Sequence, residues 1–282
     1  MKKIAVIGAG VMGTGVAQAF AEKGLNVILI DITVEILKEA EEKIKNNIRF
    51  QHLIHKNKGK MNPEDVLKFI LFTTDFQMLK DVDFVIENVP EKWETKKGIY
   101  EKIDKICKKN CIYMVNTSCI SITKIAALTN RPSKVVGTHF MNPVPIKNAV
   151  ETIKGYHTSE ETLKELEELL KIVGKESIVV NDYPGFVSNR VSHLFMNEAA
   201  FVVQDQVTTP EKVDEIFKRC FGHTMGPLET ADLIGLDTVM DSLDVLYESY
   251  QDPKFRCCPL IRKLVYAGRC GRKVGKGFYD YN

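Results

Sequence analysis

The 282-residue chain lacks the features that mark membrane, fibrous or nucleic-acid-binding proteins. It has one tryptophan, and no apolar run reaches the length of a membrane span. The net charge is only +2, so composition favours neither nucleic acid nor an acidic membrane as a partner. There is no low-complexity segment and no internal repeat. Hydrophobic residues make up 44% of the chain, which is ordinary for a globular protein and sufficient for two domains with a sizeable core.

The number and spacing of the cysteines bear on the redox state of the thiols and on the cellular compartment of the protein. The seven cysteines are an odd number, and no two have CxxC spacing. This pattern favours reduced, mostly buried thiols over disulfides, and we expect no metal site. Nothing in the sequence assigns a role to the adjacent pair Cys257 and Cys258. The first expected strand begins at residue 3 or 4, which leaves no room for a targeting peptide, so we expect a cytoplasmic protein.

The first 31 residues carry the clearest motif. An apolar strand over residues 4–7 leads into Gly8, Gly10 and Gly13, and a small-residue helix then leads to a second strand that ends at Asp31. We expect Gly8 to form a tight turn, Gly10 to admit a pyrophosphate and Gly13 to let the helix pack closely on the sheet. The helix N-terminus favours a bound phosphate. Together these features predict a dinucleotide site.

Asp31 bears on the choice of dinucleotide. A carboxylate at this position can accept a hydrogen bond from a ribose 2′-hydroxyl. Ile32 and Thr33 follow it, and no Arg or Lys stands beside it to neutralise a 2′-phosphate. We therefore expect NAD(H) in preference to NADP(H).

Apolar runs alternate with helical patterns as far as about residue 180, which is typical of a doubly wound α/β sheet. Further strands are expected at residues 70–73, 84–87, 112–116, 135–140, 150–153 and 177–180. The polar stretch between the second and third strands predicts a projecting helical hairpin with a basic middle. Beyond residue 183, apolar periodicity predicts helices at residues 187–203, 210–221, 236–250 and 258–267. The expected fold is α/β, with a Rossmann-type sheet over residues 1–183 and an all-α domain over residues 184–282.

Polar side chains follow the expected strands where those strands end. Asn116 and Ser118 follow one strand, and His139 and Asn142 lie at the end of the next. The carboxyl ends of parallel strands form the ligand site of such sheets. A histidine there could remove a hydroxyl proton during hydride transfer, with Glu151 on the following strand orienting its ring. On position alone, a packed structural histidine is the commoner outcome.

Eight segments resemble the 3-hydroxyacyl-CoA dehydrogenase family, and they cover essentially the whole chain. In order, they are GAGVMGTGVAQAFAEKG, ENVPEKWETKK, NTSCISIT, RPSKVVGTHFMNPVP, VETIKG, PGFVSNR, MGPLETADLIGLD and AGRCGRKVGKGFYDYN. The resemblance implies NAD-dependent interconversion of a short-chain 3-hydroxyacyl-CoA and its 3-ketoacyl-CoA. A catalytically silent homologue is disfavoured because the implied catalytic residues are intact. An NADP-linked reductase of similar fold is disfavoured because it would lack HFMNPVP.

The resemblance also implies roles for individual residues. His139 would be the catalytic base and Glu151 its partner, while Ser118 would bind the substrate oxygen and Asn189 would help to hold the thioester. The residues implied to contact NAD are Gly8, Gly10, Met12, Gly13, Asp31, Glu91, Lys96, Asn116, Ser118, Asn142 and Lys273.

Two further expectations from the resemblance concern the substrate carrier and the assembly. Lys56 and Lys60 on the expected hairpin are candidate contacts to phosphates of coenzyme A. The all-helical domain would cover the substrate and form a homodimer.

Two positions depart from the common family pattern. Cys119 replaces a serine, a mild change in volume that leaves Ser118 in place. Lys147-Asn148-Ala149 replaces a Met-Lys-Leu run on a strand close to the active site, shortly before the catalytic glutamate. This is either a surface change on an edge strand or a more polar acyl pocket with Lys147 close to the substrate. The second reading leaves open an alternative function, oxidation of a small polar hydroxyacyl group on an acyl carrier protein in polyketide or antibiotic biosynthesis.

Overall fold

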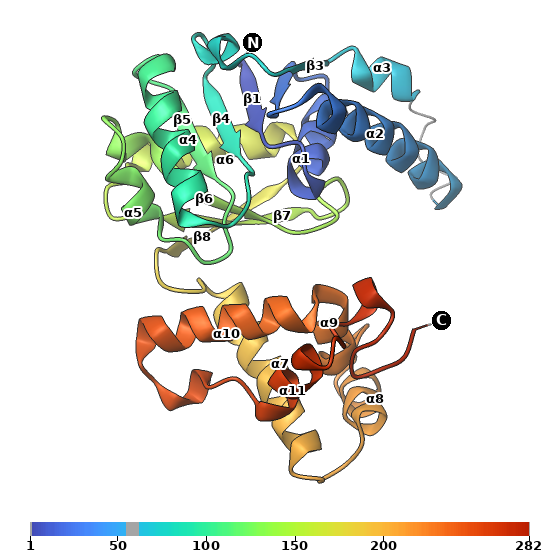
Figure 1. Ribbon diagram of the computed structural model, residues 1–282. Helices are drawn as coiled ribbons and strands as arrows, with labels where there is room; N and C mark the ends of the chain where they lie inside the picture. The colour runs from blue at the N-terminus through green and yellow to red at the C-terminus, as the bar shows by residue number, and fades with distance from the viewer. Residues whose placement is uncertain (1, 55–61, 282) are drawn as a thin grey trace. The chain divides into compact units, whose positions relative to one another are not determined.

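The chain divides into two compact units, Met1–Asp182 and Tyr183–Asn282 (Figure 1). The division lies one residue from the boundary expected from the sequence. The computed structural model describes residues 2–54 and 62–281. Lys56 and Lys60, the two candidate coenzyme A contacts, lie outside these residues.

The first unit is built on one eight-stranded sheet with the order β3-β2-β1-β4-β5-β6-β7-β8. Neighbouring strands are parallel except for β6 and β7, which are antiparallel. The strands are β1 (Ile4–Ile7), β2 (Val27–Ile30), β3 (Ile70–Thr73), β4 (Phe84–Glu87), β5 (Ile112–Val115), β6 (Val135–Phe140), β7 (Ala149–Lys154) and β8 (Glu176–Asn181). The predicted Rossmann-type sheet is confirmed, and four strand ranges (4–7, 70–73, 84–87 and 135–140) have the bounds expected.

Helices cover both faces of this sheet. Its helices are α1 (Val11–Ala21), α2 (Val34–Ile54), α3 (Pro63–Leu67), α4 (Trp93–Ile106), α5 (Ile122–Ala126) and α6 (Glu160–Ile172). On one face, strand residues such as Val6 and Met114 share an apolar cluster with Phe20 of α1, Ile44 of α2 and Leu169 of α6. Because side chains alternate along a strand, Tyr113 points to the opposite face, where its ring meets Tyr100 of α4.

The second unit is helical, as predicted. Its helices are α7 (Ser188–Gln204), α8 (Pro210–Cys220), α9 (Pro227–Ile234), α10 (Leu236–Tyr250) and α11 (Pro259–Tyr266). Helix α9 was not expected from the sequence. It has only 8 residues between Gly226 and Gly235, and buried Asp232 interrupts its apolar side. The Asp232 carboxylate accepts main-chain N–H bonds from Phe278 and Tyr279, which ties the C-terminal segment to α9.

Most of the cysteines are buried, as the sequence predicts. Cys107, Cys111, Cys257 and Cys258 are buried, and all seven cysteines are free. Burial raises the pKa of Cys257 to about 12 and also raises the pKa of Cys258. Few thiolates form there at neutral pH, so Cys257 and Cys258 serve as core packing.

No helix in the described part of the chain is long and apolar enough to span a membrane.

Candidate active site

The antiparallel pairing of β6 and β7 brings a histidine and a carboxylate together. His139 and Glu151 are direct partners in the ladder, so their side chains leave the same face of the sheet. That face carries α5, because a Cβ on Gly137 would meet Ile122. The His139 Nδ1 atom lies 3.0 Å from Glu151 Oε2, and both side chains are about nine-tenths buried.

Ser118 completes a three-residue chain of contacts. Its Oγ lies 3.2 Å from His139 Nε2. When His139 Nδ1 carries the proton and donates a hydrogen bond to the Glu151 carboxylate, the Nε2 atom of the neutral ring keeps its lone pair. The Ser118 hydroxyl can then donate to Nε2, and so can a substrate hydroxyl placed beside it. The arrangement is that of a general base held in one tautomer by a carboxylate.

The loop that carries Ser118 is organised by Glu91. One carboxylate oxygen of Glu91 accepts the main-chain N–H groups of Ser118 and Cys119, each at 2.9 Å. The same oxygen accepts the Thr117 hydroxyl. Glu91 therefore shapes the loop beside the base, while its expected contact with NAD stays a prediction. Sequence reasoning gave no role to Thr117.

Lys96, expected to contact NAD, is fully buried under this loop. Its ammonium lies 2.9 Å from both carboxylate oxygens of Glu87 and donates to the Asn116 carbonyl at 2.8 Å. It also lies 3.6 Å from Glu91 Oε2. Burial raises the pKa of Glu87, and the Lys96 charge opposes that shift. This geometry makes Lys96 a support for the residues around it, while its expected contact with NAD stays a prediction. In the sequence, the partner Glu87 could be noticed only as a glutamate at the end of an apolar strand.

Asn116 links the ends of three neighbouring strands. Its side-chain Nδ2 donates to Asn88 Oδ1 at 2.6 Å, just beyond β4. Its Oδ1 accepts the N–H of Phe140 at 3.3 Å, at the end of β6. These bonds orient the amide at the carboxyl edge of the sheet, where a dinucleotide binds in this fold.

The glycine loop has the geometry that a pyrophosphate requires. Gly8 has φ +91°, and a Cβ there would lie 2.7 Å from the Asn88 carbonyl oxygen. A Cβ on Gly13 would lie 1.7 Å from the Gly8 carbonyl oxygen, so α1 can approach the sheet only without one. No described atom lies within 4 Å of a Cβ built on Gly10. Met12 packs partly buried against the core, and its expected contact with NAD stays a prediction.

The start of α1 is also suited to an anion. Among the described residues, no side chain caps α1, and its first turn contains no acidic residue. The helix N-terminus is therefore left to a ligand phosphate, so the residues present fit a dinucleotide.

Asp31 lies beside this loop, as expected. Its Oδ2 accepts the Ala9 N–H at 2.5 Å, and its Oδ1 accepts the Ile32 N–H at 2.6 Å. The first bond fixes the carboxylate against the glycine loop. Each oxygen retains a second lone pair that can accept a ribose hydroxyl.

Two expected site residues lie in the second unit. Asn189 is in the first turn of α7, where its carbonyl oxygen lies 2.9 Å from His193 Nδ1. Lys273 lies 2.5 Å from Asp237 Oδ2, near the start of α10. The contacts expected of Asn189 with substrate and of Lys273 with NAD stay predictions.

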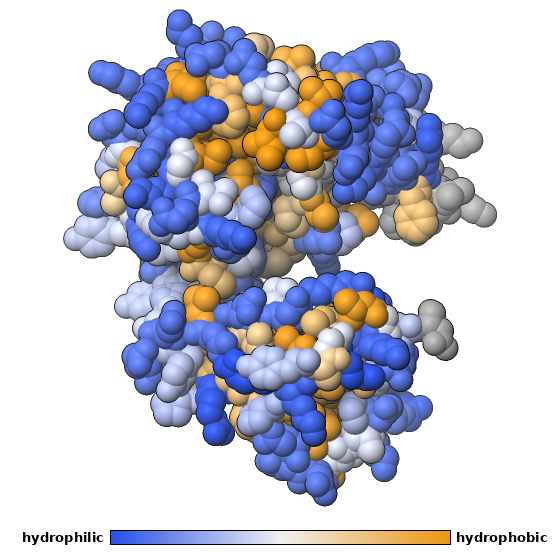
Figure 2. Space-filling view, in the orientation of Figure 1, coloured by the Kyte–Doolittle hydropathy of each residue, from blue (hydrophilic) through white to orange (hydrophobic). Residues whose placement is uncertain are grey.

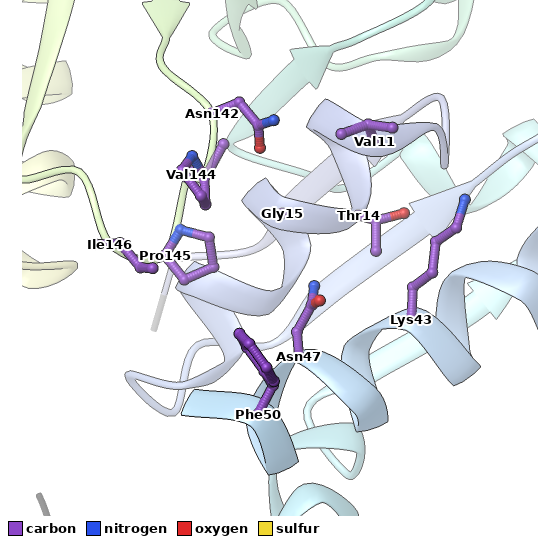
Figure 3. A pocket seen from close by; sticks show the side chains of 11 residues that line it. Val11, Thr14, Gly15, Lys43, Asn47, Phe50, Asn142, Val144, Pro145 and Ile146 are labelled. Atoms are coloured by element: carbon purple, nitrogen blue, oxygen red, sulfur yellow. The ribbon is translucent and has the colours of Figure 1, made fainter. Parts of the chain in front are cut away.

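A cavity of about 440 Å³ opens between α1, α2 and the loop that joins β6 to β7 (Figure 3). Lys43, Asn47 and Phe50 of α2 line one side, and Asn142 lies on the other side with the segment Pro143–Ile146. Phe50 and Ile146 present exposed apolar surface beside the Lys43 and Asn47 side chains. This mixture is typical of a small-molecule site.

Lys147 does not line this cavity and lies exposed on the same loop. The interpretation of its segment as part of an edge strand is wrong, because β7 lies between β6 and β8 in the sheet. Strand β8 pairs with the side of β7 that faces away from β6, and Lys147 and Asn148 precede β7 as loop residues.

In the described part of the chain, no cluster of three His, Cys, Asp or Glu side chains could hold a metal ion.

The glycine loop, the strand-end carboxylate and the histidine–glutamate pair define a dinucleotide-dependent dehydrogenase. The family model for the 3-hydroxyacyl-CoA dehydrogenase NAD-binding domain matches residues 3–183, and the model for the C-terminal domain of the same family matches residues 185–281. The chain therefore belongs to the 3-hydroxyacyl-CoA dehydrogenase family, an NAD-dependent family of oxidoreductases.

Individual relatives match along the full length of the chain. A probable 3-hydroxybutyryl-CoA dehydrogenase from Bacillus subtilis is 43% identical over 100% of this chain and 98% of its own. A 3-hydroxybutyryl-CoA dehydrogenase from Clostridioides difficile is 41% identical over 99% of both. The crystal structure of (S)-3-hydroxybutyryl-CoA dehydrogenase from Ralstonia eutropha superposes with a TM-score of 0.95, at 40% identity, over 100% of this chain and 99% of that one.

Replacing Asp31 tests the expected preference for NAD(H). The carboxylate should repel a 2′-phosphate, so wild-type kcat/KM should strongly favour NADH over NADPH. Asp31→Ala should lower that ratio by about tenfold, since a single repulsion of about 1.4 kcal/mol gives that factor. The measurement is kcat/KM with both cofactors in both proteins. An intrinsic preference of the wild type for NADPH would contradict the assignment.

Proposed function

We propose that this protein interconverts 3-hydroxybutyryl-CoA and acetoacetyl-CoA with NAD as the hydride carrier. The observation that carries the proposal is the chain Ser118–His139–Glu151, with contacts of 3.2 and 3.0 Å at the carboxyl edge of a dinucleotide-binding sheet. Relatives that are 40–43% identical over the full chain bear the name of this activity, which supports the short acyl chain.

In the oxidation, NAD⁺ supplies the acceptor for the hydride that leaves C3 of the substrate. His139 Nε2 takes the hydroxyl proton, and the C3–O bond becomes a carbonyl. The Glu151 carboxylate keeps Nδ1 protonated and stabilises the imidazolium that forms. Ser118 is placed to hydrogen-bond the substrate oxygen while it also faces Nε2. The reverse reaction returns the proton from the imidazolium to the carbonyl oxygen.

The cavity between α1 and α2 fits the carrier part of the substrate. Its volume of about 440 Å³ lies within the usual range of roughly 300–1,000 Å³ for ligand sites. The Phe50 ring offers a surface on which a purine can stack, and the Lys43 ammonium can pair with a phosphate. These groups favour coenzyme A over an acyl carrier protein, whose phosphopantetheine arm carries no adenosine.

The second unit supports a homodimer. Its described helices and connecting loops leave large apolar side chains exposed, and apolar residues lie among polar ones on its visible face (Figure 2). The exposed apolar residues include Val191, Val207, Ile216, Phe221, Leu233, Ile234, Val245, Tyr247 and Tyr266. A second copy of the chain could cover such side chains in a subunit interface. The free cysteines suit a reducing compartment, so we also infer a cytoplasmic location.

His139→Gln tests the proposed reaction. The variant should lose kcat with acetoacetyl-CoA and NADH by about a hundredfold or more, the usual contribution of a general base. NADH binding should persist, because the glycine loop is untouched. His157→Gln, at an exposed histidine on the same unit, serves as the control and should behave as wild type. Near-wild-type turnover of His139→Gln would falsify the assignment of the base.

A truncated substrate tests the carrier site. In the double variant Lys43→Ala/Phe50→Ala, the KM for acetoacetyl-CoA should rise by about tenfold, which corresponds to about 1.4 kcal/mol. The KM for the N-acetylcysteamine thioester of acetoacetate should not change, since that substrate lacks the adenosine and its phosphates. Lys38→Ala, exposed on the same helix, is the matched control. An equal rise in KM on both thioesters would place coenzyme A elsewhere.

Light scattering at micromolar concentration tests the assembly. A homodimer should have a mass of about 64 kDa, twice the 31.9 kDa of one chain. Phe221→Glu and Tyr266→Glu should shift the protein toward the monomer if these side chains are covered by a second copy. A wild-type protein that is monomeric throughout this range would refute the dimer.

A further inference from the structure

Lys175 is a buried charge that the reaction itself does not use. It occupies the turn between α6 and β8, directly after Gly174, whose φ is +71°. The side chain is only 5% exposed. Its ammonium donates to the main-chain carbonyl oxygens of Val144 and Lys147, each at 2.6 Å.

Both carbonyls belong to the loop that joins β6 to β7. Pro143, Val144, Pro145 and Ile146 of this loop form one wall of the cavity (Figure 3). The N–H groups of Ile146 and Lys147 bond back to the Pro143 carbonyl at 3.1 and 3.2 Å. The loop is therefore a tight turn, and its Val144 and Lys147 carbonyls face the α6–β8 connection.

A second bond docks the end of the same loop. The N–H of Glu176, next to Lys175, donates to the Asn148 carbonyl at 2.7 Å. The turn after α6 thus supplies donors to three carbonyls within five residues of the loop. An unsatisfied buried carbonyl is costly, so the buried bond from Lys175 to the Val144 carbonyl favours this loop conformation.

A buried ammonium loses its hydration, so other interactions must compensate for that loss. Burial lowers the pKa of Lys175, and the charge of Glu22 opposes that shift. The two bonds to carbonyls are charge-assisted, and such bonds are stronger than neutral ones. An uncharged apolar side chain would avoid the cost of burial but would leave both carbonyls without these donors.

We infer that Lys175 is a positioning residue for the acyl-CoA substrate, because its ammonium holds the β6–β7 loop as a wall of the carrier cavity. The inference rests on the proposed function for its kinetic readout. His139 and Glu151 are held by the pairing of β6 with β7. The two hydrogen bonds of Lys175 go to the loop between these strands and not to the paired residues. Lys175 should therefore govern substrate binding and leave the chemical step intact.

The test compares Lys175→Met, which keeps the aliphatic stem but loses the charge, with Lys175→Arg, which keeps it. In Lys175→Met, the KM for acetoacetyl-CoA and the calorimetric Kd of free coenzyme A should both rise by about tenfold. The kcat should stay within about twofold of wild type, and the Kd of NADH should not change. Lys175→Arg should recover most of the lost affinity. Lys171→Met, at an exposed lysine of α6, is the matched control.

Two outcomes overturn the inference. One is an unchanged KM and an unchanged coenzyme A Kd in Lys175→Met. The other is a parallel fall of kcat, NADH binding and Tm with no selective change in KM, which is the result of a purely structural role. If Lys175→Met does not fold, Lys175→Gln replaces it, and wild-type KM and Kd in that variant have the same meaning.

Failure of the proposed function gives a different result. A wild-type protein that binds coenzyme A but does not turn over acetoacetyl-CoA or 3-hydroxybutyryl-CoA would contradict the reaction. The Kd of coenzyme A in the Lys175 variants would still decide whether Lys175 positions the cavity wall.

Discussion

The candidate active site depends on one buried ion pair, Lys96 with Glu87. Neither side chain has exposed surface, and the Lys96 ammonium also holds the Asn116 carbonyl and lies 3.6 Å from Glu91. Loss of one partner would leave a lone charge in a desolvated site, which typically costs about 3–5 kcal/mol. The pair is therefore stable only as a whole. Through Glu91 it connects the ends of β4 and β5 to the loop that carries Ser118.

The histidine–glutamate pair depends on a different constraint, the register of β6 against β7. His139 and Glu151 face each other because the two strands are antiparallel and paired at these residues. A slip of one residue would turn one of the two side chains to the opposite face of the sheet. Gly137 lies two residues before His139. A Cβ at this position would collide with the side chains of Ile122 and Ile153, so the glycine allows β6 to lie close against α5.

Local pattern was sufficient to predict the glycine loop, most strands and the division into two units, because each of these follows from short-range periodicity and turn chemistry. It was not sufficient for contacts set by packing. Lys96 reaches Glu87 because α4 folds back over β4, and no spacing rule says which of several lysines on α4 does so. The place of β7 inside the sheet depends on β8, and strand order cannot be read from alternation. Helix α9 was missed because buried Asp232 gives it a mixed pattern.

One connection between two strands serves both chemistry and binding. The strands β6 and β7 present His139 and Glu151 on the face that carries α5, whereas the loop between them lines a cavity bounded by α1 and α2 of the other face. The ladder fixes the first arrangement, and Lys175 fixes the second through main-chain carbonyls. Because these bonds do not involve the side chains of the loop, the segment Lys147-Asn148-Ala149 can differ from the common family pattern without disturbing the base. Sequence change in this loop should therefore alter which substrates bind before it alters how fast they react.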